Sequence, residues 1–99
     1  MYGSIFRFQL KDGKEDEVVR LLQAEGSGDE ERLRGSGMVA SYIFKLDKGG
    51  HMGVAVFESQ DAYVANAADP RQDEWYRKFR ALLEADPEWN DGEIIAVAP

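Results

Sequence analysis

A tight-turn sequence near the middle of the chain separates two segments that are typical of β-strands. Residues 38–46 (MVASYIFKL) and 51–58 (HMGVAVFE) are rich in aromatic and β-branched side chains, and Asp47-Lys48-Gly49-Gly50 lies between them. Such side chains favour the pleated strand, and glycine tolerates the positive φ angles of hairpin turns. The sequence therefore predicts an antiparallel hairpin over residues 38–58.

Two further strands and two helical regions flank this hairpin. Residues 2–10 alternate with period two, which predicts a first strand, and residues 93–98 predict a last strand after an Asn90-Asp91-Gly92 turn. The apolar spacing of residues 15–25, which end before Gly26, predicts a helix. Residues 29–34 favour one further helical turn.

The second helical region carries two start signals. Ser59 is suited to cap a helix, and Asp69-Pro70 places a capping residue before a proline at the first helical position. The resulting order is β-α-β-β-α-β in a chain of 99 residues, which we interpret as one domain, residues 1–99. This order predicts an α+β, ferredoxin-like fold, a four-stranded antiparallel sheet with its helices on one face.

The predicted strands are apolar on both faces, although helices on one side can cover only one of them. One face is predicted to carry the aromatic residues Phe6, Phe8, Tyr42, Phe44 and Phe57. The other is predicted to carry Ile5, Val39, Ile43, Val54, Val56 and Ile94. The helices, which carry residues such as Trp75 and Phe79, match the aromatic face. An open aliphatic face usually marks an interface, so we expect a homodimer that pairs sheet against sheet.

Charge and composition exclude several classes of function. The formal net charge is −7, which argues against nucleic acid or an anionic membrane surface as a partner. The chain has no cysteine and one histidine, so we expect no metal site. The sequence has neither signal-peptide order nor a long apolar run, and a cytoplasmic location is expected by default.

The residues predicted between sheet and helices combine aromatic rings with a few polar groups. Such a mixture is either ordinary core packing with polar tips at the surface, or the lining of a small-molecule site. The candidate pocket residues are Phe6, Phe8, Tyr42, Asn66, Trp75 and Tyr76. His51, beside the hairpin turn, is interpreted as an exposed turn residue, with a general base or haem ligand as the alternative. No residue stands out as catalytic.

Several stretches of this sequence resemble the antibiotic-biosynthesis-monooxygenase domain family, which belongs to the dimeric α/β-barrel superfamily. The resemblance lies in residues 4–8 (SIFRF), 11–18 (KDGKEDEV) and 56–63 (VFESQDAY), followed by Asn66 and Asp69-Pro70, and it covers nearly the whole chain. It implies two ferredoxin-like subunits that pair their sheets into a barrel, with a pocket between sheet and helices in each.

The resemblance also implies two kinds of activity. Characterised members include cofactor-independent monooxygenases that oxidise polycyclic aromatic polyketides, and haem-degrading enzymes. The haem degraders carry Asn, Trp and His where this chain has Phe6, Asn66 and Tyr76, so haem degradation is not expected and neither is a cofactor. Two interpretations stay open: a homodimeric barrel that binds a small aromatic molecule without known activity, and a cofactor-independent monooxygenase acting on a phenolic or polyketide-like substrate.

Overall fold

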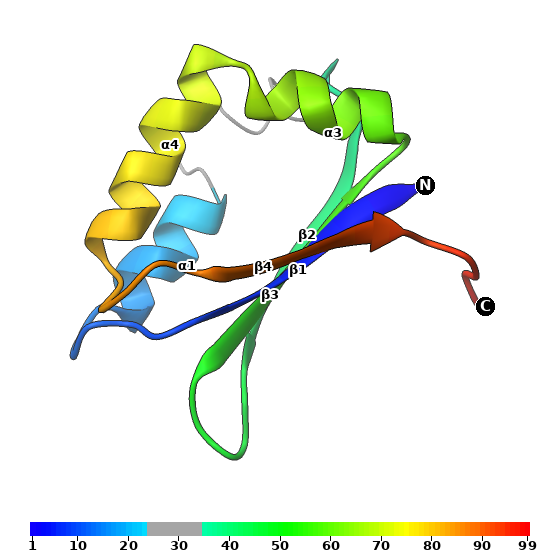
Figure 1. The fold of residues 1–99 in the computed structure, drawn as a ribbon. Coiled ribbons are helices and arrows are strands. Elements are labelled where there is room, and N and C mark those ends of the chain that lie inside the picture. Colours follow the sequence, from blue (N-terminus) through cyan, green and yellow to red (C-terminus); the bar gives the residue numbers. More distant parts are fainter. Residues whose placement is uncertain (24–34) are drawn as a thin grey trace.

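The computed structural model describes residues 1–23 and 35–99, so the helical turn expected over residues 29–34 lies outside the described residues. Along the chain the elements are β1 (Tyr2–Phe8), α1 (Glu15–Gln23), β2 (Met38–Lys45), β3 (His51–Phe57), α3 (Gln60–Ala67), α4 (Pro70–Ala81) and β4 (Glu88–Glu93). The four strands form one antiparallel sheet in the order β2-β3-β1-β4. The three described helices lie on one side of this sheet (Figure 1). The predicted α+β ferredoxin-like fold is confirmed.

Both predicted start signals of the second helical region form helix caps. Ser59 Oγ accepts a hydrogen bond of 3.1 Å from the backbone N–H of Ala62 at the start of α3. Asp69 Oδ1 accepts one of 2.8 Å from the N–H of Arg71 at the start of α4, with Pro70 in the first turn. Each cap satisfies a backbone donor that the helix itself leaves unpaired. The region therefore contains two separate helices, α3 and α4, which meet at an angle on the helix-covered side of the sheet (Figure 1).

The core lies where α1 and α4 meet the middle of the sheet. Its fully or almost fully buried members are Phe6, Phe8, Val18, Phe79 and Leu83. Phe79 presents its ring edge-on to both sheet phenylalanines, at centroid distances of 6.0 Å from Phe6 and 5.2 Å from Phe8. Such edge-to-face pairs add about 0.5–1.5 kcal/mol to the free energy gained by burial alone. Phe79 thus fixes α4 against β1.

Strand β4 begins earlier than predicted. Residues 90–92, expected as a turn, lie inside β4 and pair with residues 3–5 of β1. The expected strand over residues 93–98 is wrong, because the chain leaves the sheet after Glu93 and Ile95 is 93% exposed. Trp89 explains the shift, since this register places it directly opposite Phe6, with 4.6 Å between the ring centroids. Tertiary packing of one large ring outweighs the local turn preference of Asn and Gly.

The side chains of β2 that face the helices are the opposite set from the one predicted. Tyr42 pairs with Val54, whereas Ile43 pairs with Gly53, which in turn lies opposite Phe6. Tyr42 and Phe44 are therefore 56% and 52% exposed on the side without helices, and Ile43 packs against the core. The alternation predicts two sets of side chains but not which set is buried, because both sets are apolar. A bulge between Met38 and Ala40 further shifts the register.

The side of the sheet without helices remains apolar after this correction. We call it the open face; its apolar residues include Ile5, Tyr42, Phe44, Val54 and Val56, and Arg7 lies on the same face of β1 as Ile5. Val39 is also exposed, while Ile94 lies beyond the end of β4, where its N–H donates to the Met1 carbonyl at 2.9 Å. Of the six predicted interface residues, Ile43 faces the helices and Ile94 lies outside the sheet. No helix in the described part of the chain is both long and apolar enough to cross a membrane.

Candidate functional site

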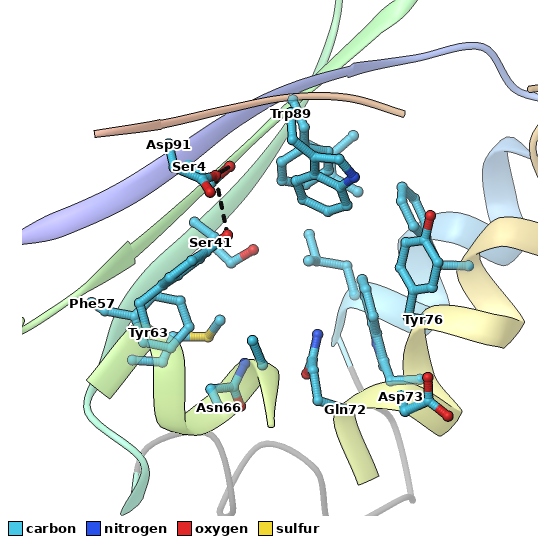
Figure 2. Close-up of a pocket in the computed structure, with 18 residues that line it drawn as sticks. Ser4, Ser41, Phe57, Tyr63, Asn66, Gln72, Asp73, Tyr76, Trp89 and Asp91 are labelled. Carbon is cyan, nitrogen blue, oxygen red and sulfur yellow. Dashed lines mark hydrogen bonds between the residues drawn. The ribbon is translucent and has the colours of Figure 1, made fainter. Parts of the chain in front are cut away.

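A cavity of about 540 Å³ lies between the sheet and the helices. Its size falls inside the range of about 300–1,000 Å³ that is usual for small-molecule sites. Figure 2 shows residues from the sheet on one side and residues from α3 and α4 on the other. The lining residues are Ser4, Phe6, Leu22, Met38, Ser41, Ile43, Ala55, Phe57, Tyr63, Asn66, Ala67, Gln72, Asp73, Trp75, Tyr76, Phe79, Trp89 and Asp91. We call this cavity the pocket.

Aromatic rings form one continuous wall of the pocket. Trp75 stacks on Phe79 with 5.3 Å between centroids and an interplanar angle of 21°, and Tyr76 lies 6.1 Å from Trp89. The indole Nε1 of Trp75 donates a hydrogen bond of 3.2 Å to the carbonyl of Leu21 in α1. This bond fixes the orientation of the Trp75 ring within the wall.

A polar cluster occupies a different side of the pocket. Ser4 Oγ donates to Asp91 Oδ1 at 2.6 Å, and the hydroxyl of Tyr63 donates to the same oxygen at 3.1 Å. Figure 2 shows these three side chains pointing toward one another from β1, β4 and α3. Burial, and then the neighbouring Asp91 carboxylate, raise the pKa of Tyr63 above its ordinary value of 10.0. Tyr63 is therefore a neutral hydrogen-bond donor over the physiological pH range.

The helices contribute further polar groups to the pocket. Asn66, on α3, is only 6% exposed, and Gln72 and Asp73 come from the first half of α4. Asp73 Oδ2 forms an ion pair of 2.7 Å with Arg77, one turn further along α4. Two amides, several hydroxyls and two carboxylates thus line a space whose remaining lining is apolar.

The structure brings together four of the six predicted pocket residues. Phe6, Asn66, Trp75 and Tyr76 line the pocket. Phe8 is a core residue instead, 3% exposed, and Tyr42 lies on the open face, so the predicted placement of these two is wrong.

Two lining residues of β4, Trp89 and Asp91, are not among the predicted pocket residues. The reason is that residues 90–92 were interpreted as a turn and not as part of a strand. Their spacing of two positions, opposite Phe6 and Ser4, puts them on the helix-covered face. Trp89 and Asp91 alternate around Asn90, and this spacing of two is the pattern in the sequence that indicates a strand here.

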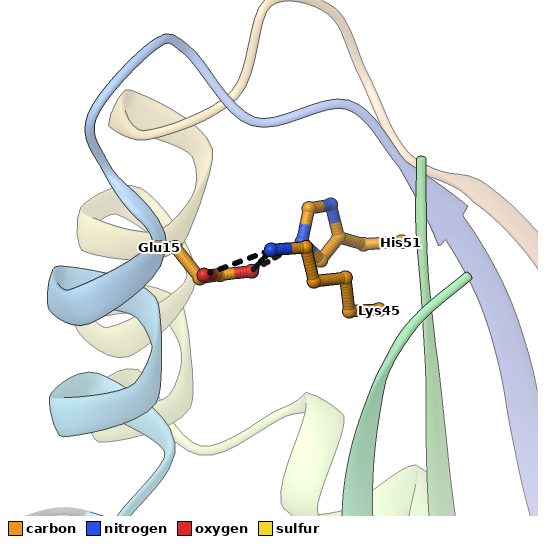
Figure 3. A network of polar contacts seen from close by, with 3 residues as sticks. All are labelled: Glu15, Lys45 and His51. Atoms are coloured by element: carbon orange, nitrogen blue, oxygen red, sulfur yellow. Dashed lines mark hydrogen bonds and ion pairs between the residues drawn. The ribbon is translucent and has the colours of Figure 1, made fainter. Parts of the chain in front are cut away.

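His51 belongs to a separate cluster at the far end of the sheet. It is the first residue of β3 rather than an exposed turn residue, and its side chain is 15% exposed. Its ring stacks on Phe8 at 5.5 Å, and Nε2 lies 3.3 Å from Glu15 Oε1, which also pairs with Lys45 (Figure 3). The hydrogen bond to His51 and then the Lys45 contacts lower the pKa of Glu15 below its ordinary value of 4.5. These contacts tie α1 to the hairpin strands.

Neither this cluster nor the pocket has the composition of a metal centre. Across residues 1–23 and 35–99, no three His, Asp or Glu side chains are grouped as metal ligands would be. His51 does not line the pocket, so it is not placed to act there as a base.

Comparison with solved structures shows which fold surrounds this pocket. No family profile and no curated protein sequence matches the chain. A monooxygenase from the gene ActVA-Orf6 of Streptomyces coelicolor, solved with the ligand Nanaomycin D, is similar with a TM-score of 0.77 and 25% identity over 99% of this chain and 91% of that chain. SnoaB from Streptomyces nogalater, a cofactor-independent oxygenase, is similar with a TM-score of 0.72. The two share 16% identity over 99% of this chain and 96% of that chain.

A third solved structure carries the family name itself. It is an antibiotic biosynthesis monooxygenase, similar with a TM-score of 0.71 and 16% identity over 97% of this chain and 100% of that chain. The three similarities extend over nearly the full length of each protein. The resemblance found in the sequence is confirmed by these neighbours: the chain has the fold of the antibiotic biosynthesis monooxygenase domain family.

Proposed function

We propose that this protein binds a small aromatic molecule in the pocket between sheet and helices. The observation that carries this proposal is the pocket itself, a space of about 540 Å³ with an aromatic wall and a polar cluster on another side. Trp75 and Trp89 offer ring faces for stacking, and hydrogen-bonding groups on Asp91 and Asn66 can orient a ligand. A purely structural core would fill this space with side chains.

Tryptophan fluorescence provides a direct test of binding. The chain has two tryptophans, and both line the pocket. We expect 1,8-dihydroxyanthraquinone to quench their emission saturably. Ala67→Phe, at a lining position of α3, is expected to weaken the quenching at least tenfold. Ala65→Phe is the matched control, because Ala65 is also exposed on the same helix and does not line the pocket. Equal quenching of both variants, or no saturation in the wild type, would contradict the proposal.

A second candidate function is the cofactor-independent oxidation of such a ligand by molecular oxygen. It is favoured by the similarity to SnoaB and to the ActVA-Orf6 monooxygenase, since these two proteins share the fold around the pocket. In this reaction a phenol or enol substrate loses a proton, and the resulting carbanion supplies the electrons. A ring methylene and O₂ then give a ring carbonyl and water. The pocket would contribute an aromatic space and two donors, Asn66 and Tyr76, that stabilise the anion.

Oxygen consumption with 1,8-dihydroxyanthrone tests this second function. The expected products are 1,8-dihydroxyanthraquinone and water, formed faster than in buffer alone. Asn66→Ala is expected to lower the rate at least tenfold without abolishing ligand quenching. Ala67→Phe should lower both, and Ala65→Phe neither. Saturable binding without any oxygen uptake above the buffer rate would leave a binding protein and exclude oxidation of this substrate.

We also infer that the protein is a homodimer that covers the open face. In support, Ile5 on β1 and Tyr42 and Phe44 on β2 are about half exposed there, and these strands, with β3 between them, carry no helix on that side. Contiguous apolar surface of this kind is rare on monomers. A second copy of the chain would bury the same residues on both partners through a two-fold axis.

A further inference from the structure

The charge of the pocket lining is one-sided. Among the described residues that line it there is no lysine, arginine or histidine, whereas two aspartates, Asp73 and Asp91, are present. A binding site for an anionic ligand normally supplies a basic side chain or a helix N-terminus. The first turn of α4 does reach the pocket, but it carries the negatively charged Asp73. The described lining therefore lacks the side-chain chemistry that a carboxylated or phosphorylated aromatic molecule would need.

The two aspartates differ in how their charge is compensated. Asp73 is paired with Arg77 at 2.7 Å. Asp91 has no ion-pair partner in the part of the chain that the structure describes, and its recorded contacts are hydrogen bonds from Ser4 and Tyr63. Both of these reach Oδ1. Within the same described residues no hydrogen bond to Oδ2 is recorded, although an ionised carboxylate can accept about two on each oxygen.

The neighbours of Asp91 make it an acceptor for a ligand. Tyr63 and Ser4 both direct their hydroxyl hydrogens at Oδ1, so they hold the carboxylate in one orientation. Tyr63 keeps its proton because burial and the Asp91 charge raise its pKa, so it does not compete for a ligand's proton. The group that completes this cluster is a hydrogen-bond donor without negative charge.

We propose that the pocket selects uncharged hydroxyaromatic molecules, with the ligand hydroxyl donating to Oδ2 of Asp91, and that it rejects their carboxylated analogues. This selectivity rests on the proposed binding of an aromatic molecule in the pocket. A hydroxyl bound to a carboxylate forms a charge-assisted hydrogen bond, which is stronger than a neutral one. A ligand carboxylate at the same place would meet the Asp91 charge, and solvent screens this repulsion in part because Asp91 is exposed.

Three probes of nearly equal shape separate these contributions. In 2-naphthol the ring carries a hydroxyl donor, in 2-methoxynaphthalene the donor is blocked, and in 2-naphthoate it is replaced by a negative charge. Calorimetric titration of the wild-type protein at pH 7 is expected to give binding of 2-naphthol about tenfold tighter than of 2-methoxynaphthalene. Binding of 2-naphthoate should be weaker again.

The variant Asp91→Asn removes the charge and keeps the shape of the side chain. We expect it to weaken 2-naphthol about tenfold, to strengthen 2-naphthoate, and to leave 2-methoxynaphthalene unchanged. The unchanged third probe shows that the variant pocket is still folded. Asp61→Asn is the matched control, because it removes the same charge from an exposed residue of α3 that does not line the pocket, and it should alter the order of the probes little.

The outcomes distinguish the selectivity by Asp91 from the proposed binding of aromatic molecules on which it rests. If all three probes bind equally well, or if Asp91→Asn leaves their order unchanged, the selectivity by Asp91 is wrong while binding of aromatic molecules stands. If 2-naphthoate binds the wild type most tightly, the selectivity is again wrong. If no probe binds the wild type or either variant, the proposed binding function fails and this inference fails with it.

Discussion

The hydroxyl of Tyr63 donates a hydrogen bond of 3.1 Å to Asp91 Oδ1, although the two residues are 28 positions apart in the sequence. Tyr63 lies on α3 and Asp91 on the edge strand β4, so this contact joins the last strand of the sheet to a helix on the other side of the pocket. The Tyr63 ring also packs against Tyr2 and Phe57, with centroid distances of 5.3 and 5.4 Å. Tyr63 is therefore both a packing residue and the donor that positions Asp91.

Asp91→Asn is expected to lower the pKa of Tyr63. The carboxylate raises this pKa through its hydrogen bond and its charge, and the neutral amide removes the charge. The pKa should stay above the ordinary value of 10.0, because burial is the largest cause of the shift and is unaffected. NMR titration of ¹³Cζ-labelled tyrosine measures the change, and Tyr42, on the open face, serves as the internal control. An unchanged Tyr63 titration would contradict the contact.

The same shift gives a pH dependence at the alkaline end. Because folding raises the pKa of Tyr63, its contribution to the free energy of unfolding is fully present below the unfolded-state pKa of about 10. The contribution is lost as the pH rises through the higher folded-state value. Tyr63→Phe, which cannot ionise at this position, should therefore show a shallower loss of thermal stability above pH 10 than the wild type. Parallel curves for the two proteins would contradict this sign.

Glu15→Gln is expected to destabilise the protein near neutral pH and to have little effect in acid. Folding lowers the pKa of Glu15, first through His51 and then through Lys45, so its stabilising contribution is present above the unfolded-state pKa. It disappears as the pH falls through the lower folded-state value. Thermal unfolding midpoints of wild type and variant should therefore differ at pH 6 and converge as the pH falls through the lowered pKa of Glu15.

Asp16→Asn provides the control for that comparison. Asp16 lies beside Glu15 in the first turn of α1, so its removal has a similar effect on the helix dipole. It takes no part in the contacts that Glu15 makes with His51 and Lys45 (Figure 3). If Asp16→Asn reproduces the pH profile of Glu15→Gln, the effect comes from the dipole and not from the cluster.

The parts of the fold that sequence could predict are those where local signals agree with packing. The hairpin over residues 38–58 and the caps at Ser59 and Asp69 are examples, since turn and capping chemistry act over a few residues. The facing of β2 was not predictable, because Tyr42 and Ile43 are both apolar and only the pairing with β3 chooses between them. That pairing is a long-range property of the sheet.

The polar side of the pocket was missed for a related reason. Asp91 sits between Asn90 and Gly92, a sequence that favours a turn by itself. Its place in β4 depends on Trp89 packing against Phe6, residues that are far apart in the chain. Phe6, Asn66, Trp75 and Tyr76 were identified because they lie on elements whose position follows from local pattern.

Gly53→Ala is expected to destabilise the protein by about 1–3 kcal/mol. A Cβ at this position would overlap the ring of Phe6, which lies across Gly53 in the neighbouring strand. The ring would have to move toward the pocket or the strands would have to separate. Chemical denaturation measures the loss. Gly92→Ala is the control, because a Cβ there has open space in β4 and should change stability much less.

A double variant tests whether the Phe6 ring is the cause. Gly53→Ala combined with Phe6→Leu should be less destabilised than the sum of the two single variants, since the smaller side chain leaves room for the new methyl group. Additive effects would mean that Gly53→Ala acts through the backbone of β3 and not through the ring.

Ile5→Glu is expected to dissociate the proposed homodimer. Ile5 is 48% exposed in β1, an inner strand of the sheet, where a two-fold axis would bring both copies close together. A carboxylate there would be buried against the apolar surface of the partner, and taking a charge out of water is costly. Sedimentation equilibrium at micromolar concentration should give twice the 11.1 kDa chain mass for the wild type and a mass near one chain for the variant.

Val64→Glu is the matched control: Val64 is 56% exposed on α3, on the helix side of the sheet, so the same charge there should leave the dimer intact. A wild-type monomer, or a dimer that survives Ile5→Glu, would contradict pairing through the open face.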